Sequence, residues 1–224
     1  MTDDFVLRRA VVSCSGLIYW AGVLIQARRI RRHIGRSPNL KPRGLKERLL
    51  WAGWFIVVLT WILQPLLVAV PGTGSAKQRW ILDFLTPEVL LTKEVGLWTA
   101  LLSPSTLIAG LILIVAGYAG TLWCYRAMGD SWRIGVNKTE KNALITLGPY
   151  RAVRHPIYLF QIVMLAGAFF LLPTILSLAI LLFHFLCVLI KAADEEAYLL
   201  SIHGQLYKDY LSQTGGLFPK VSRL

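Results

Sequence analysis

The chain has 224 residues, of which 55% are hydrophobic and only 16% are charged, and its formal net charge is +12. Long apolar runs at this length exclude an ordinary soluble core and favour one compact membrane domain. The same apolar content argues against nucleic acid as the partner of the positive charge. On a membrane protein, excess Lys and Arg marks cytoplasmic loops and contact with anionic lipids.

The first apolar run, Ala10 to Ala27, follows Arg8 and Arg9 in the manner of a signal peptide, but it lacks a small-x-small cleavage pattern. We therefore interpret it as a retained transmembrane helix. The next segment, Arg28–Arg48, contains nine Lys or Arg residues and one acid. The positive-inside rule predicts that this segment is a cytoplasmic loop and that the N-terminus is outside. Arg8 and Arg9 on the outer side conflict with that rule.

Two further spans are predicted at Leu49–Val70 and at Leu107–Met128. The region between them, Lys77–Leu102, has balanced charge and is expected to form a loop with a short interfacial helix on the outer side. A polar stretch, Gly129–Arg154, follows the third span and is expected to be cytoplasmic.

The segment Ile157–Ile190 contains 34 residues without a formal charge. One straight helix of that length would reach ~50 Å, well beyond a ~30 Å bilayer core. Because Pro173 lies near its middle, we predict a helical hairpin folded at 172–174. The fold class is therefore all-α: a polytopic membrane protein with about five transmembrane helices, a C-terminal helical hairpin and a cytoplasmic tail.

The polar stretch before the hairpin combines charges and aromatic rings at a helix start. Pro156 suits the first turn of a helix, whose free N–H groups and partial positive charge favour an anion. Arg154 and His155 flank that point, and Tyr150 and Tyr158 add rings and hydroxyls. Taken alone, these residues also fit topology markers and an interfacial aromatic belt.

The tail after the hairpin carries a second polar cluster. Lys191 and Glu195 are four residues apart on one helical face, within an acidic group at 194–196. A solvated helix face with one ion pair is the alternative interpretation. Tyr207 and Tyr210 have the spacing of a packing stripe.

The hairpin is expected to bring these clusters together, with His155 and Tyr158 near Lys191 and Glu195. Such a site suits a zwitterionic or cationic cofactor beside a lipid-soluble substrate. A sulfonium accepts aromatic faces and carboxylates together. Histidine and cysteine spacing gives no metal motif, so we expect no metal.

Two motifs resemble the isoprenylcysteine carboxyl methyltransferase family, whose core is shared by the related phospholipid N-methyltransferases. The first, L-x-T-x-G-P-Y-x-x-x-R-H-P-x-Y, spans Leu144–Tyr158, and the second, E-E-x-x-L-x-x-x-x-G-x-x-Y-x-x-Y, spans Glu195–Tyr210. The family consists of integral membrane enzymes that use S-adenosylmethionine. The resemblance divides the chain into N-terminal transmembrane helices, 1–128, and a methyltransferase core, 129–224.

The resemblance implies a cytoplasmic cofactor pocket built from both motifs. The cofactor-binding residues that it implies are Asn142, Ala143, Leu144, Ile145, Tyr150, His155, Pro156, Ile157, Tyr158 and Glu195. It also implies catalytic roles for Lys191, Glu195 and Glu196, and substrate contacts from Lys191 and Arg154. The family favours an arginine where this chain has Lys191, which keeps the charge but lacks the bidentate fork for a carboxylate.

The sequence therefore predicts methyl transfer from S-adenosylmethionine to a lipophilic acceptor at the cytoplasmic membrane face, with isoprenylcysteine-type carboxyl O-methylation as the leading reaction. Phospholipid or other small N- or S-methylation is an alternative, and an amine acceptor would need a base such as Glu196, His155 or a tyrosine. A second alternative is a sterol-reductase-like enzyme using NADPH, and a third is a non-enzymatic scaffold. The expected partners are the lipophilic or prenylated substrate and membrane lipids, without nucleic acid.

Overall fold

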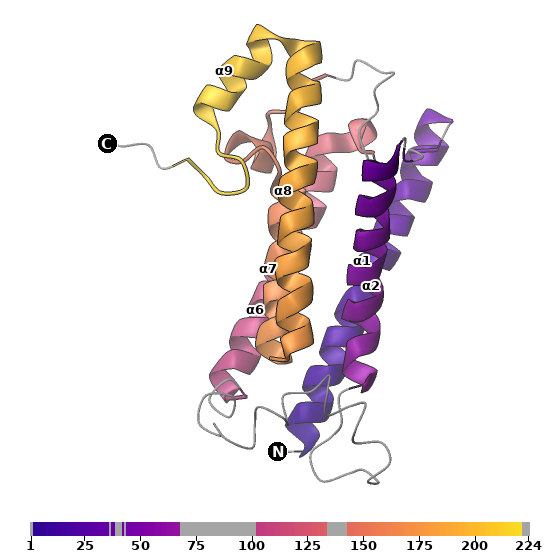
Figure 1. The fold of residues 1–224 in the computed structure, drawn as a ribbon, viewed down its shortest axis with the longest axis vertical. Helices are drawn as coiled ribbons and strands as arrows, with labels where there is room; N and C mark the ends of the chain where they lie inside the picture. The colour runs from indigo at the N-terminus through magenta and orange to yellow at the C-terminus, as the bar shows by residue number, and fades with distance from the viewer. Residues whose placement is uncertain are drawn as a thin grey trace.

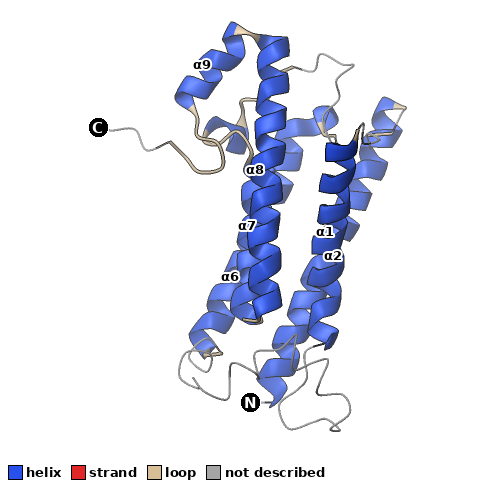
Figure 2. Cartoon of the chain, viewed as in Figure 1, coloured by secondary structure: helices blue, strands red, loops and turns tan. Residues whose placement is uncertain are grey.

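The computed structural model describes residues 2–35, 37–38, 42, 44–67, 102–133 and 143–220. Within these ranges the regular structure is helical, and the only β-type pairing is an isolated bridge between Val153 and Gly215 (Figures 1 and 2). The predicted all-α class is confirmed. The helices are α1 (Thr2–Ile34), α2 (Leu45–Leu67), α6 (Pro104–Met128), α7 (Pro156–Leu171), α8 (Ile175–His203) and α9 (Gln205–Gln213), with short 3-10 helices η1 (Gly129–Ser131) and η2 (Gly148–Arg151).

Four of these helices, α1, α2, α6 and α8, are long and apolar enough to cross a membrane, which makes the chain a multi-pass membrane protein. The helix α7 has 16 residues and therefore reaches only ~24 Å, less than a ~30 Å core. The prediction of about five transmembrane helices thus corresponds to four full spans and one shorter apolar helix. The predicted interfacial helix at Lys77–Leu102 lies outside the described residues, apart from Leu102.

The predicted hairpin is confirmed, because α7 ends at Leu171 and α8 begins at Ile175. The Thr174 side chain caps α8 by accepting a 2.9 Å hydrogen bond from the Ser177 backbone N–H. The helix α8 has 29 residues and is ~44 Å long, so that its polar end, from Lys191 onward, extends beyond the apolar core. This extension carries the acidic cluster, and α9 folds back beside it (Figure 1).

The predicted boundaries of the first two spans were wrong. The helix α1 continues through the arginines to Ile34, so residues 28–34 are helical and not part of a loop. Arginine is a good helix former, and cations in a last turn are stabilised by the helix dipole, so charge alone does not end a helix. The helix α2 begins at Leu45, four residues before the predicted start.

The helices α6 and α7 approach each other closely along a face of small residues. A Cβ atom placed on Gly110 would lie 2.7 Å from Leu171 Cγ, and one on Gly167 would lie 2.8 Å from the Gly110 carbonyl oxygen. Small residues allow helix backbones in membranes to come close enough for extensive van der Waals contact. This contact holds the end of α7 against the start of α6.

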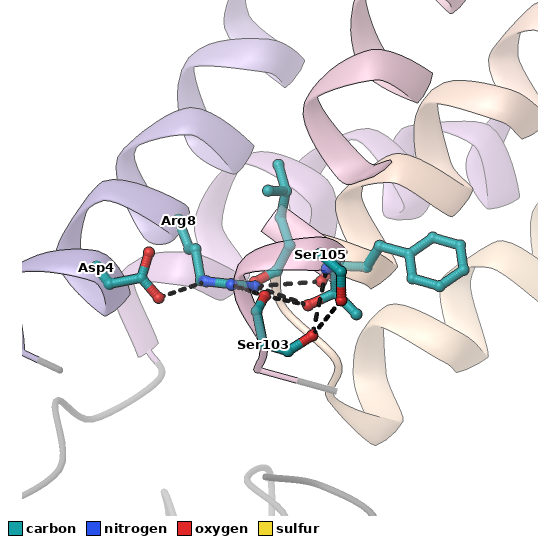
Figure 3. Close-up of polar contacts among 7 residues, drawn as sticks. Asp4, Arg8, Ser103 and Ser105 are labelled. Atoms are coloured by element: carbon teal, nitrogen blue, oxygen red, sulfur yellow. Dashed lines mark hydrogen bonds and ion pairs between the residues drawn. The ribbon is translucent and has the colours of Figure 1, made fainter. Parts of the chain in front are cut away.

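At the end of the bundle far from α9, a buried arginine joins α1 to α6 and to the end of α7 (Figure 3). The Arg8 side chain is completely buried and forms an ion pair of 3.0 Å with Asp4. Because Arg8 is buried and paired, it is not a free surface charge, and its place on the predicted outer side does not conflict with the positive-inside rule. Its other acceptors are the carbonyl oxygens of Ser103, Phe170 and Leu171 and the hydroxyl of Thr106.

A second polar connection joins α2 to the turn between α7 and α8. The Gln64 side-chain amide donates to Thr174 Oγ1 at 2.5 Å and to Ser177 Oγ at 2.6 Å, and all three side chains are buried. Polar contacts between helices add to association where the surroundings are apolar. Both N-terminal helices are therefore fixed to the α7–α8 turn.

Candidate functional site

The start of α7, the polar end of α8 and the C-terminal tail meet at the end of the bundle that carries α9 (Figure 1). The tail pairs with the residues just before α7: the Arg154 backbone N–H donates to the Gly215 carbonyl oxygen at 2.9 Å, and that of His155 donates to Gly216 at 3.2 Å. In return, the Gly215 N–H donates to the Ala152 carbonyl oxygen at 3.3 Å. This pairing fixes the backbone that presents Arg154 and His155.

Glu195 is the centre of one cluster. The Tyr158 hydroxyl donates to Glu195 Oε1 at 2.7 Å, and the Lys191 ammonium lies 4.0 Å from the same oxygen. His155 Nδ1 lies 3.5 Å from Oε2. The side chains of Glu195 and Lys191 are 21% and 24% exposed, so solutes can reach both. The structure thus brings together the four side chains that the hairpin was expected to place near one another.

Glu196 belongs to a tighter cluster. Its Oε1 accepts a 2.8 Å hydrogen bond from Arg154 Nε and lies 3.0 Å from His155 Nε2. The Arg154 guanidinium also donates to the Thr214 carbonyl oxygen at 2.5 Å. Arg154 therefore connects α8, the segment before α7 and the tail.

Aromatic rings line the same end of the bundle. The His155 ring is stacked on Tyr158, with centroids 5.7 Å apart and planes inclined by 15°. Tyr150 is buried, and its carbonyl oxygen accepts a 2.6 Å hydrogen bond from the Tyr210 hydroxyl. Tyr207 and Tyr210 are buried with ring centroids 5.9 Å apart, which confirms the predicted packing stripe.

The ion pairs shift two pKa values in opposite directions. The hydrogen bond from His155, followed by that from Arg154, outweighs burial and lowers the pKa of Glu196 to about 2. Burial by itself would lower the pKa of His155, but Glu195 and Glu196 outweigh it and raise that pKa above its ordinary value of 6.5. His155 and Glu196 therefore stabilise each other's charged forms.

The raised pKa of His155 predicts a loss of stability at alkaline pH. Because the folded pKa exceeds the unfolded one, the contribution of protonated His155 is complete below about pH 6.5 and is lost as pH rises through the folded pKa. We expect the thermal unfolding midpoint in detergent to decrease as the pH is raised above about 6.5. His155→Gln should flatten this profile.

The described residues among the remaining predicted ones occupy the start of α7 and the segment before η2. Pro156 is buried at the first position of α7, and Ile157 packs against the core. Ala143, Leu144 and Ile145 form a non-helical segment that leads to η2, and Asn142 lies outside the described residues.

Sequence reasoning missed the contribution of Thr214 and of Gly215–Gly216, although a glycine pair near a tail is a signal for close backbone approach. In the described part of the chain, no group of three metal-binding side chains occurs.

Two metal-resistance proteins are similar to part of this chain. The nickel-cobalt-cadmium resistance protein NccN of Alcaligenes xylosoxydans xylosoxydans is 27% identical over 121 residues, covering 54% of this chain and 53% of the relative. The cobalt-zinc-cadmium resistance protein CzcN of Cupriavidus metallidurans is 24% identical over 127 residues, covering 57% and 54%. The chain thus spans about half the length of these relatives.

A family model adds a match that includes the site. The model of the phospholipid methyltransferase family matches residues 105–206. The match contains α6 except its first residue, the whole first motif, the hairpin and most of the second motif. Residues 105–206, somewhat under half of this chain, are therefore similar to the phospholipid methyltransferase family.

Proposed function

We propose that the chain transfers a methyl group from S-adenosylmethionine to a lipophilic acceptor at the cytoplasmic membrane surface. The observation that carries the proposal is the contact of Glu195 with Tyr158, His155 and Lys191 at the polar end of the hairpin. A partly exposed carboxylate beside stacked aromatic rings offers what a sulfonium or ammonium group needs. S-adenosylmethionine supplies an electrophilic methyl group, and the chain has to bind and align it.

The two adjacent glutamates suit different roles in this proposal. Glu195 and Lys191 are partly exposed, and we assign Glu195 to the cofactor and Lys191 to the acceptor. Glu196 and Arg154 are paired with each other, and Arg154 also holds the tail carbonyl. That arrangement favours a positioning role for both, in place of substrate contact by Arg154.

The electrostatics favour an acceptor that is already a nucleophile. The low pKa of Glu196 makes it a weak base, and the neighbouring Glu195 and Glu196 favour the protonated form of His155. A carboxylate or thiolate acceptor needs no base, because methyl transfer from a sulfonium mainly requires alignment. We therefore propose carboxyl O-methylation of the isoprenylcysteine type first, with Lys191 facing the carboxylate. Methylation of a phospholipid amine is the alternative that the family description supports.

Titration of the purified protein in detergent with S-adenosylhomocysteine and with NADPH, followed by calorimetry, tests the cofactor assignment. We expect saturable binding of S-adenosylhomocysteine and none of NADPH. Binding of NADPH alone would instead support the reductase alternative. Binding of neither compound by folded protein would contradict the proposal and favour a scaffold.

A further inference from the structure

Four arginines cover one side of α1 near its C-terminal end. The side chains of Arg28, Arg29, Arg31 and Arg32 are exposed, whereas Ala27 and Ile30 are buried against the bundle. At 100° per residue, the four arginines occupy about 160° of the helix surface, opposite the buried residues. They therefore form one outward-facing cationic surface, which we call the arginine surface.

The arginine surface has no acidic counterpart in the described part of the chain. Two other cations near this end of the bundle are paired: Lys46 lies 2.6 Å from Asp194, and Arg154 lies 2.8 Å from Glu196. No carboxylate among the described residues pairs with any of the four arginines, and their exposure leaves the guanidinium groups available to an external anion. Four like charges on adjacent turns repel one another unless an anion lies between them.

Below the arginine surface, the same side of α1 is apolar and equally exposed. Leu17, Ile18, Leu24 and Ile25 are between 54% and 64% exposed. By helical geometry they fall within the same arc as the arginines. An apolar strip topped by cations matches the shape and polarity of an anionic phospholipid, with acyl chains below and a phosphate above. A free phosphate would gain nothing from the apolar strip.

The length of α1 places the arginines at the membrane boundary. The helix has 33 residues, or ~50 Å, and a ~30 Å core accounts for only part of it. The apolar run ends at Ala27, directly before the arginines. His33 lies 3.5 Å from Asp130 in η1, so the arginine surface is at the same end of the bundle as the candidate site.

We propose that Arg28, Arg29, Arg31 and Arg32 bind the head groups of anionic phospholipids, whose acyl chains lie along the exposed apolar strip of α1. The planar guanidinium fork suits phosphate oxygens and makes two parallel hydrogen bonds. A Lys or Arg close to an anionic membrane surface strengthens attraction by about fivefold. This binding does not depend on methyl transfer, and it goes beyond the positive-inside role that the arginines have in topology.

Native mass spectrometry of the full chain, stripped of lipid in detergent, tests the proposal. The protein is titrated with phosphatidylglycerol and with phosphatidylcholine of identical acyl chains. We expect the first phosphatidylglycerol to bind about tenfold more tightly than phosphatidylcholine. The variant R28Q/R29Q/R31Q/R32Q should lose this preference, whereas R151Q/K208Q, which removes two cations elsewhere on the chain, should keep it.

A folding control and two competition measurements complete the test. Saturable S-adenosylhomocysteine binding or an unchanged size-exclusion profile shows that the quadruple variant is folded. Equal binding of the two lipids by the wild-type chain would overturn the proposal, and so would a preference for phosphatidylglycerol that persists in the quadruple variant. Displacement of phosphatidylglycerol by an equimolar amount of inorganic phosphate would also overturn it, because the apolar strip would then contribute nothing. Tighter binding of a single-stranded oligonucleotide than of the lipid would assign the arginine surface to another partner.

Discussion

Replacing Arg8 by methionine is expected to destabilise the protein by about 3–5 kcal/mol. Methionine keeps most of the volume but removes every donor from a completely buried position. The carbonyl oxygens of Ser103, Phe170 and Leu171 would then remain buried without this donor, and each unmade hydrogen bond costs about 1–3 kcal/mol. Reversible unfolding in mixed micelles, or the thermal midpoint in detergent, measures the loss.

Arg9→Met is the matched control, because Arg9 is adjacent on α1 and donates to the carbonyl oxygens of Pro65 and Leu66 from a more exposed position. Its effect should be clearly smaller. Arg8→Lys should fall between the two, since lysine retains the charge but cannot reach acceptors in several directions at once. If Arg8→Met and Arg9→Met were equally mild, Arg8 would not hold α1 to the α6–α7 pair.

The second large effect is expected for Glu195→Gln, which should weaken S-adenosylhomocysteine binding by about 10- to 100-fold. The amide keeps the shape of the side chain but removes the negative charge that Tyr158, Lys191 and His155 surround. Hydrogen bonds to charged groups are worth about 1.5–3 kcal/mol, which sets the range. Calorimetric titration gives the dissociation constant directly.

Glu196→Gln provides the isosteric comparison at the next residue. Glu196 is held by Arg154 and His155 and connects α8 to the tail, so its loss should lower the thermal midpoint more than it lowers cofactor affinity. Equal binding by Glu195→Gln and wild type would contradict the assignment of Glu195. So would a Glu196→Gln variant that stays fully stable but no longer binds S-adenosylhomocysteine.

The hairpin and the meeting of its two ends could be predicted from the sequence because both rest on strong local signals. An uncharged run too long for one helix, with Pro173 near its middle, requires a turn. Once the turn is fixed, the start of α7 and the polar end of α8 must lie side by side. The distances from Glu195 to Tyr158 and His155 follow from that topology.

The contacts of the tail could not be predicted, because they join residues far apart in sequence through backbone atoms. The local sequence does not indicate that the Ala152 carbonyl oxygen accepts a hydrogen bond from Gly215. It also does not indicate that the Tyr210 hydroxyl donates to the Tyr150 carbonyl oxygen. The same holds for Arg154, whose charge fits a topology marker equally well. Its pairing with Glu196 and Thr214 emerges only from the folded tail.

Charged residues in α1 were the hardest to interpret. Arg8 resembles the basic start of a signal peptide, and only its burial among carbonyl oxygens explains its presence in an otherwise apolar bundle. The arginines from Arg28 onward resemble a loop by composition, but they continue the helix. Helix propensity and the helix dipole outweigh the tendency of charge clusters to mark loops.

Transfer of a labelled methyl group tests the central claim most directly. Membranes containing the wild-type chain are incubated with S-adenosylmethionine that carries a deuterated methyl group, and the lipid extract is analysed by mass spectrometry. The proposed function predicts a lipid-soluble product that carries the deuterated methyl, and its loss in membranes with Glu195→Gln. Membranes in which folded wild-type protein transfers no label to any lipid-soluble or prenylated molecule would contradict the claim.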